Sequence, residues 1–192
     1  VGLNSNHTFG ESSYNDALPT IIKVLEAKNL VENSDGAKCV FLEKEKSPLI
    51  VQKSDGGYLY ATTDLAAISY RIEELKANRI LYFVDSRQSL HFQQIFSLAN
   101  LAGLNPEGIS LEHMAFGTML NEEGKPFKMS KRKGDYITVE DLVKEVGKDA
   151  ARFIMLSRSS NVQLDFDFDK VKEKTKDNPL YYVPVSYTHL TL

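Results

Sequence analysis

The sequence lacks the features of a disulfide-bonded, membrane-spanning or secreted protein. Cys39 is its only cysteine, which excludes an internal disulfide and a zinc site built from cysteines, and fits a reducing cytoplasm. No apolar run approaches the roughly 18 residues that a membrane span needs. Residues 1–4 have neither the basic nor the apolar segment of a signal peptide. We therefore expect a cytoplasmic protein that makes no contact with a membrane.

Extremes of composition are missing as well. Of the 192 residues, 42% are hydrophobic and 26% charged, which excludes a disordered charged tail and a collagen-like fibre. The net charge of −3 excludes a uniformly basic nucleic-acid surface. No internal repeat is visible, and the missing initial methionine suggests a fragment or a processed chain.

The middle of the chain alternates between strand and helix patterns. The predicted strands are 58–62, 80–84 and 113–118, and the predicted helices between them are 64–75 and about 88–101. Because residues 80–84 are continuously apolar, we expect that strand to be buried on both faces. The alternation is typical of a doubly wound α/β sheet.

Other elements flank this middle region. Residues 1–16 show no period and are predicted to be a loop. Before the middle region we predict a helix from Leu18, with an inward face of Leu18, Ile21, Ile22 and Leu25, and strands at 38–42 and 49–51.

After the middle region we predict a hairpin at 120–127 and a helix that is opened by a Thr138/Asp141 capping box and ends near Val146. A helix at 149–157 follows, and its apolar face includes Phe153, Ile154 and Leu156. A further helix is predicted to start within residues 165–176.

Tyr60 and Asp64 lie four residues apart where strand 58–62 meets the next helix. An aromatic face and a carboxylate that converge can hold a guanidinium by stacking and by a charge-assisted hydrogen bond. A core tyrosine followed by an N-cap aspartate is the commoner meaning of this spacing, and spacing alone does not decide between the two.

Residues 85–91 follow the strand 80–84 directly and include Gln88 and His91. Polar side chains above a helix N-terminus suit a small polar ligand, a ribose or a phosphate. Helix capping by Asp85 or Ser86, with a structural His91, is the alternative that the local pattern leaves open.

A basic cluster follows the predicted hairpin. Its cations are Lys125, Lys128, Lys131, Arg132 and Lys133, and Gly134 comes next. Such a run is usually a solvated surface. A mobile cationic loop of this kind could also neutralise the charge that develops on a leaving pyrophosphate. The order Lys-Met-Ser-Lys at residues 128–131 carries more information than the number of charges.

That order resembles the signature loop of class I aminoacyl-tRNA synthetases, and here too it follows a predicted strand and hairpin and precedes a helix. Segments 58–67, 82–91, 116–120 and 149–158 are similar to the corresponding stretches of arginyl-tRNA synthetases. The resemblance covers about residues 10–183. It implies that arginine and ATP form arginyl-adenylate and pyrophosphate, after which the arginyl group passes to tRNA(Arg).

The resemblance also implies residue roles. Tyr60 would stack on the arginine side chain, Asp64 would pair with its guanidinium, and Gln88 would contact the amino acid. The implied ATP-binding residues are His91, Gly117, Met119, Lys128, Met129 and Lys131, and the implied catalytic residues of the loop are Lys128, Ser130 and Lys131. ATP is a substrate that Mg²⁺ accompanies, and no metal site of the protein itself is expected. The arginine carboxylate is the attacking group, so the protein supplies positioning and charge.

The implied fold is the C-terminal half of a doubly wound, Rossmann-like nucleotide-binding domain at residues 1–136, with the signature loop at 128–134. Residues 137–183 would be a helical connection to an α-helical anticodon-binding domain, whereas residues 184–192 do not fit the family. A His-Ile-Gly-His type motif is absent, so we expect half an active site and a chain that is inactive and poorly soluble alone.

Two functions are alternatives to that of an arginyl-tRNA synthetase. A class I synthetase for another amino acid is disfavoured by Tyr60, Asp64 and Gln88 together. A non-catalytic RNA-binding or regulatory paralogue remains the alternative of another class.

Overall fold

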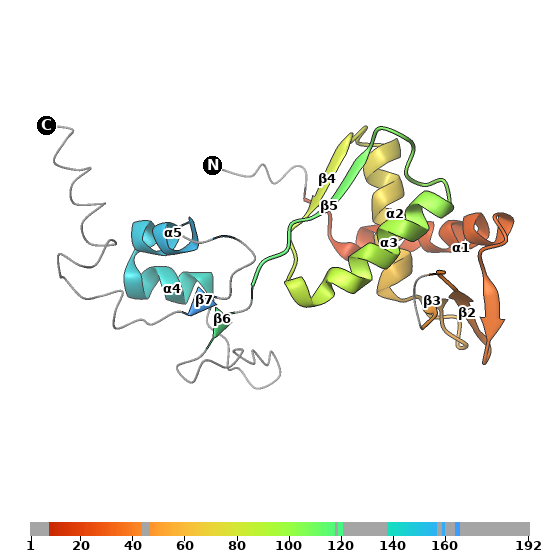
Figure 1. The fold of residues 1–192 in the computed structure, drawn as a ribbon, viewed down its shortest axis with the longest axis horizontal. Helices are drawn as coiled ribbons and strands as arrows, with labels where there is room; N and C mark the ends of the chain where they lie inside the picture. Colours follow the sequence, from red (N-terminus) through yellow and green to blue (C-terminus); the bar gives the residue numbers. More distant parts are fainter. Residues whose placement is uncertain are drawn as a thin grey trace, which may run out of the picture. The chain divides into compact units, whose positions relative to one another are not determined.

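The computed structural model describes residues 8–43, 47–117, 119–120, 138–156, 159 and 164–165 (Figure 1). These residues form two compact units. The first unit contains the described residues up to Tyr82 together with Arg87–His113, and the second contains Phe83–Ser86 and the described residues from Met114 onward. Among the described helices, none combines the length and the apolarity that crossing a membrane requires.

The first unit begins with two consecutive helical segments. The 3₁₀ helix η2 spans Glu11–Ala17 and leads into α1 at Leu18–Ala27, with Pro19 in its first turn. The predicted inward face of α1 is confirmed, and its buried residues are Leu18, Ile21, Ile22 and Leu25. The predicted loop at 1–16 is wrong for residues 11–16, because a 3₁₀ turn has no apolar period of its own to reveal it.

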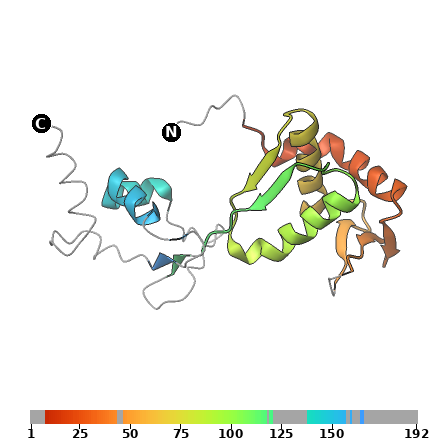
Figure 2. The same ribbon diagram turned by 45° about the horizontal axis from the view of Figure 1, so that its top comes forward.

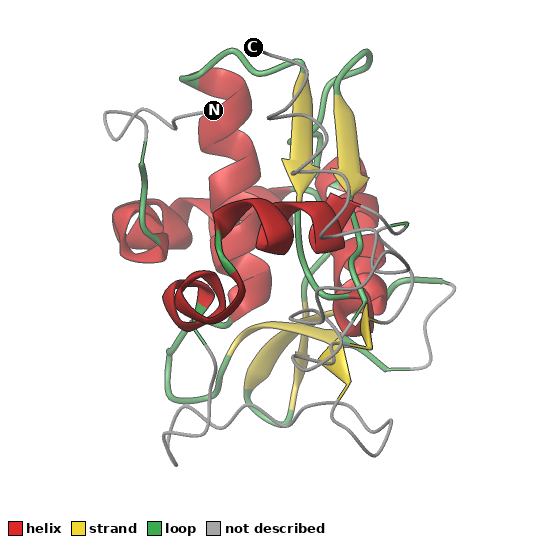
Figure 3. Ribbon diagram, turned by 90° about the vertical axis from the view of Figure 1, so that its left-hand side faces the viewer, coloured by secondary structure: helices red, strands yellow, loops and turns green. Residues whose placement is uncertain are grey.

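A three-stranded antiparallel sheet follows, in the order β1-β2-β3 (Figure 3). Its strands are β1 at Glu32–Ser34, β2 at Ala37–Val40 and β3 at Leu49–Gln52. The hairpin between β1 and β2 turns at Asp35 and Gly36, which have positive φ angles of 49° and 77°. The strands predicted at 38–42 and 49–51 are confirmed within about two residues.

Helix α2 spans Tyr60–Glu73, so the predicted strand 58–62 is wrong. Within that segment only Tyr58 pairs with a strand residue, in an isolated antiparallel bridge to Gln52. The aromatic and β-branched residues of 58–62 favour a strand, but the buried residues of α2 recur with a helical period. Tertiary packing therefore overrides the intrinsic strand propensity of this segment. The buried residues of α2 are Ala61, Thr62, Leu65, Ala66, Ala67, Ile68 and Ile72.

Two parallel strands complete the first unit, β4 at Arg79–Tyr82 and β5 at Ser110–His113 (Figure 2). The strand predicted at 113–118 is therefore wrong except for His113, because β5 ends at that residue, and Glu112 within β5 is paired across the sheet with Arg79. Burial alternates along β4, with Ile80 buried and Leu81 exposed. The expected burial on both faces is wrong for the described part of the chain.

Helix α3, at Ser89–Leu101, connects the two parallel strands and contacts β5. The helix predicted at about 88–101 is confirmed, and Gly103, with a φ of 73°, follows its end. Its buried residues are Phe92, Ile95, Leu98 and Ala99. The chain is thus a mixed α/β fold with parallel and antiparallel strand pairs.

The second unit has two short parallel pairings. Asp85 forms an isolated parallel bridge with Phe116, in which the Ser86 N–H donates to the Phe116 carbonyl at 2.9 Å. Strand β6 at Met119–Leu120 pairs with β7 at Leu164–Asp165. The predicted hairpin beyond residue 120 and the predicted helix beyond residue 165 lie outside the described residues.

Two helices complete the described part of this unit, α4 at Val139–Val146 and α5 at Lys148–Leu156. The predicted capping box is confirmed, because the Asp141 N–H donates to Thr138 Oγ1 and the Thr138 N–H donates to Asp141 Oδ2, each at 3.0 Å. The predicted inward position of Leu156 is wrong, since that side chain is 79% exposed.

Candidate functional site

The first turn of α2 carries two of the predicted site residues. Leu59 is the N-cap, with extended backbone and no capping side chain, and Tyr60 is the first helical residue. Tyr60 is 72% exposed, and Asp64 follows one helical turn later on the same face. The commoner interpretation of this spacing, a core tyrosine and an N-cap aspartate, is therefore wrong for both residues.

A buried hydroxyl fixes this turn to the antiparallel sheet. The side chain of Thr62 is fully buried and donates a hydrogen bond to the carbonyl of Val51 on β3. Its backbone N–H also donates to the Leu59 carbonyl at 3.0 Å. Because Thr62 faces the sheet, the neighbouring Tyr60 and Thr63 are presented to the other side.

Tyr60 lines an open hollow of about 440 Å³. That volume lies within the range of about 300–1,000 Å³ that is usual for small-molecule sites. The lining combines two tyrosines, a carboxylate, an ammonium group, an amide and hydroxyls, from Glu11, Ser12, Asn15, Lys53, Tyr58, Leu59, Tyr60 and Thr63. The sequence analysis missed Glu11, Ser12 and Asn15. Their polar side chains, just before a helix with Pro19 in its first turn, were the only signal of a site there.

Asp64 and His91 are 27 residues apart in sequence and meet between α2 and α3. Nε2 of His91 lies 2.7 Å from Oδ2 of Asp64, and each side chain is 27% exposed. The imidazole stands edge-on against Phe92, with ring centroids 5.3 Å apart and an interplanar angle of 79°. Two predicted site residues are therefore in direct contact.

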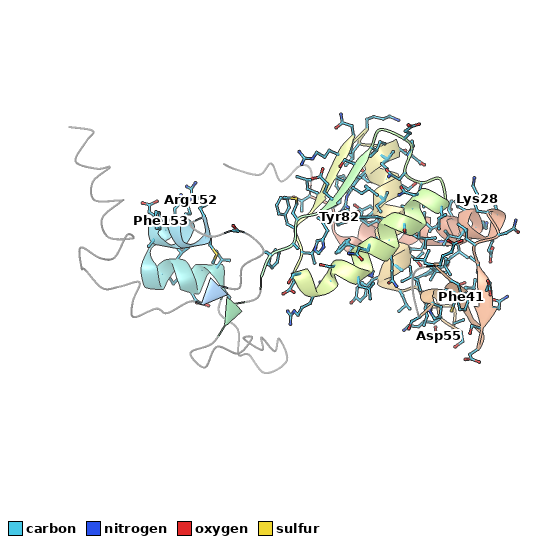
Figure 4. All side chains as sticks on the ribbon, viewed as in Figure 1. Lys28, Phe41, Asp55, Tyr82, Arg152 and Phe153 are labelled. Atoms are coloured by element: carbon cyan, nitrogen blue, oxygen red, sulfur yellow. The ribbon has the colours of Figure 1, made fainter. Side chains whose placement is uncertain are left out.

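Tyr82, which is labelled in Figure 4, lies at the end of β4 and belongs to an aromatic cluster beside this contact. Its ring packs against Phe92 and Phe96, with centroid distances of 4.8 and 5.5 Å. Arg71 Nη1 donates to the Tyr82 hydroxyl at 3.0 Å. Burial is the main cause that raises the pKa of Tyr82, the positive charge of Arg71 lowers it and the negative charge of Asp64 raises it, and together these effects bring it to about 12. Tyr82 is therefore a neutral phenol near neutral pH, within reach of the Asp64 charge.

Gln88 is exposed at the N-cap of α3, three residues before His91. Neither Asp85 nor Ser86 holds the N-cap of α3, so the capping interpretation of this segment is wrong for that helix. The amide of Gln88 is accessible to a ligand at the start of the helix whose first turn carries His91.

Two of the remaining predicted residues are described, and they belong to the second unit. Gly117 is half-buried and follows the bridge at Phe116, and Met119 is the first residue of β6. Lys128, Met129, Ser130 and Lys131 lie outside the described residues. Among the described side chains, no group of three or more histidine, cysteine, aspartate or glutamate residues could hold a metal ion.

Known proteins give an independent comparison. The family model "tRNA synthetases class I (R), catalytic domain" matches residues 2–184. The arginine–tRNA ligases of Shewanella baltica and Shewanella oneidensis are each 50% identical to the chain over 171 residues, which is 86% of this chain and 29% of theirs. The chain thus spans less than a third of the length of these curated relatives.

Solved structures agree on the fold. The arginyl-tRNA synthetase of Plasmodium falciparum superimposes with a TM-score of 0.75 and 28% identity, over 95% of this chain and 34% of that chain. The Thermus thermophilus enzyme, at 18% identity and a TM-score of 0.64 over 93% of this chain and 40% of its own, supports the fold alone. With the family match extending over nearly the whole sequence, the chain belongs to the class I tRNA synthetases (R) and lies within their catalytic domain.

Proposed function

We propose that the protein carrying this chain is an arginine–tRNA ligase, which activates arginine with ATP and transfers it to tRNA(Arg). The observation that carries the proposal is the exposed ring of Tyr60, which lines a polar hollow and lies one helical turn before the carboxylate of Asp64. The 50% identity to proteins named arginine–tRNA ligase supports the same activity.

The arginine side chain suits the residue types at this site. A guanidinium is a planar, permanently charged fork that stacks on aromatic rings and pairs with carboxylates. Tyr60 supplies the aromatic face, and Asp64 supplies the carboxylate. Glu11 lines the same hollow as Tyr60, so we assign it as a second carboxylate for the cationic substrate. The exposed amide of Gln88 would contact the amino acid at the start of α3.

The nucleotide would be bound by the remaining predicted residues. Gly117 and Met119 would border the adenine, and Lys128 and Lys131 would neutralise the triphosphate, with Met129 and Ser130 between them. His91 would lie near the pocket that arginine and ATP share. Mg²⁺ would arrive with ATP. The arginine carboxylate attacks the α-phosphorus, the bond to the bridging oxygen breaks, and pyrophosphate leaves with the electron pair.

We also propose the finer architecture. The helix α3 between the parallel strands β4 and β5 supports a doubly wound, Rossmann-like domain, of which residues 1–136 would be the second half. Residues 137–183 would then connect to a helical anticodon-binding domain. We expect the protein to act in the cytoplasm, where tRNA is aminoacylated.

ATP–pyrophosphate exchange tests the proposed function in the full-length protein that contains this chain. We expect exchange with arginine but not with lysine, measured with and without tRNA. The exchange should fall strongly in Asp64→Asn and be kept in the matched control Glu112→Gln, which changes a carboxylate on β5. A folded protein that shows no exchange under any of these conditions would favour the non-catalytic paralogue.

A further inference from the structure

One side-chain contact joins the two helices that carry the predicted arginine-binding residues. Nε2 of His91 on α3 lies 2.7 Å from Oδ2 of Asp64 on α2. This is the distance of a charge-assisted hydrogen bond between an N–H donor and a carboxylate. The contact therefore holds the Asp64 carboxylate against a second element of the fold, in addition to its own helix.

The imidazole of His91 is itself supported from behind. Its ring stands edge-on against Phe92, which is 4% exposed. Phe92 in turn packs against Tyr82 at 4.8 Å and against the His113 ring at 5.0 Å. A donor that is backed by a packed aromatic cluster has few other rotamers to adopt.

We propose that His91 is a positioning residue of the arginine pocket, which holds Oδ2 of Asp64 and leaves Oδ1 for the guanidinium. The proposal rests on the proposed function, because it takes the guanidinium of arginine as the partner of Asp64. Nε2–H of the ring would donate to Oδ2, and the negative charge of Asp64 would remain available to the substrate.

A carboxylate that is oriented in advance binds a fork-shaped cation better than a rotating one. Less side-chain freedom is lost when the ligand arrives, and the remaining oxygen keeps its lone pairs for the ligand. His91 then influences arginine binding through Asp64, whereas a residue that touches the nucleotide would influence ATP binding. Removing the ring nitrogens of His91 should therefore change the arginine KM if His91 positions Asp64, and the ATP KM if His91 touches the nucleotide.

The test uses two variants in the full-length protein that contains this chain. His91→Phe keeps a ring against Phe92 but removes the N–H, and His91→Gln restores an amide N–H at a similar reach. We expect His91→Phe to raise the arginine KM by about tenfold and to leave the ATP KM within about twofold of the wild-type value. We expect the arginine KM of His91→Gln to return most of the way to the wild-type value. In an Asp64→Asn background, His91→Phe should add less than about a twofold effect, since the two residues act as one unit.

Several outcomes would overturn the proposal. A higher ATP KM with an unchanged arginine KM would assign His91 to the nucleotide, and two unchanged KM values would make the contact structural only. A wild-type protein without arginine-dependent exchange would refute the proposed function instead. If His91→Phe does not fold, ¹⁵N shifts of the wild-type ring decide: we expect Nε2 to respond to arginine and to Asp64→Asn, and a response to ATP alone would contradict the positioning role.

Discussion

Two carboxylates of the first unit each have a partner at 2.7 Å, in different surroundings. Asp64 meets His91 between two helices, where both side chains are 27% exposed. Glu112 on β5 binds Arg79 on β4 through both oxygens, at 2.7 and 2.8 Å, with side chains 33% and 59% exposed. Ser110 adds a third hydrogen bond to Glu112 at 2.7 Å.

The difference separates a structural carboxylate from one that can serve a ligand. Glu112 receives three hydrogen bonds from its own sheet, and its ion pair with Arg79 is exposed to solvent, where such a pair stabilises little. The hydrogen bond of Asp64 with His91 involves Oδ2, and Asp64 lies one turn from an exposed tyrosine that lines a hollow. Equal distances therefore do not imply equal roles, and substitutions at four positions can test this contrast.

Replacing Asp64 should give the largest effect on function. Asp64→Asn keeps the size of the side chain and removes its charge, so we expect kcat/KM for arginine in pyrophosphate exchange to fall by about 10²–10³-fold. Glu112→Gln should change it by less than about twofold. Equal losses in the two variants would erase the contrast between the carboxylates.

Tyr60 should affect arginine binding without affecting folding. Because its side chain is 72% exposed, Tyr60→Ala should leave the free energy of unfolding within about 0.5 kcal/mol. Loss of the aromatic face should raise the arginine KM by about tenfold, and Tyr60→Phe should keep the wild-type value. Urea unfolding and steady-state exchange measure the two quantities, and an unchanged KM in Tyr60→Ala would remove the ring from the pocket.

Thr62 should show the opposite pattern to Tyr60, because its hydroxyl is buried against Val51. Thr62→Val removes the donor at nearly constant volume and should lower the free energy of unfolding by about 1 kcal/mol, whereas Thr62→Ser retains the hydrogen bond. Urea unfolding followed by circular dichroism checks this, and equal stabilities of the valine and wild-type proteins would argue against an anchoring role.

The smallest effect should be the contribution of the exposed Glu112–Arg79 ion pair to the pH dependence of the free energy of unfolding. Hydrogen bonds from Arg79 and then Ser110 lower the pKa of Glu112 to about 2, from 4.5. Since the pKa of the folded state is the lower one, the stabilisation is present above pH 4.5 and is lost as the pH falls toward 2. Unfolding titrations across this range should show a shallower loss of stability in Glu112→Gln, and identical slopes would contradict the pairing.

Features that depend on local pattern could be predicted from the sequence. The inward face of α1, the end of α3 at Gly103 and the Thr138/Asp141 capping box are each specified within a few neighbouring residues. The start of α2 was not predictable in this way, because the hydrogen bond from Thr62 to Val51 connects residues 11 apart. The exposed face of β4 likewise depends on which segments cover the sheet.

The candidate site could also be predicted in part from local sequence pattern, whereas the rest depends on tertiary packing. The pattern of Tyr60 and Asp64 pointed to a guanidinium, but spacing alone did not exclude a core tyrosine and an N-cap aspartate. Their exposure and place in α2 removed that alternative. The contact of Asp64 with His91 and the place of Glu11 beside Tyr60 arise from tertiary packing, which no local period reports. Roles in nucleotide binding, including those of Lys128 and Lys131, stay predictions.

The central claim is that Asp64 recognises the positive charge of the arginine side chain, and citrulline tests it most directly. Citrulline has nearly the shape of arginine, with a neutral urea group in place of the guanidinium. The measurement is the ratio of kcat/KM for arginine to that for citrulline in pyrophosphate exchange, in the wild-type protein and in Asp64→Asn. We predict a strong preference for arginine that falls by at least about tenfold in Asp64→Asn. A variant that keeps the full wild-type preference would contradict the account.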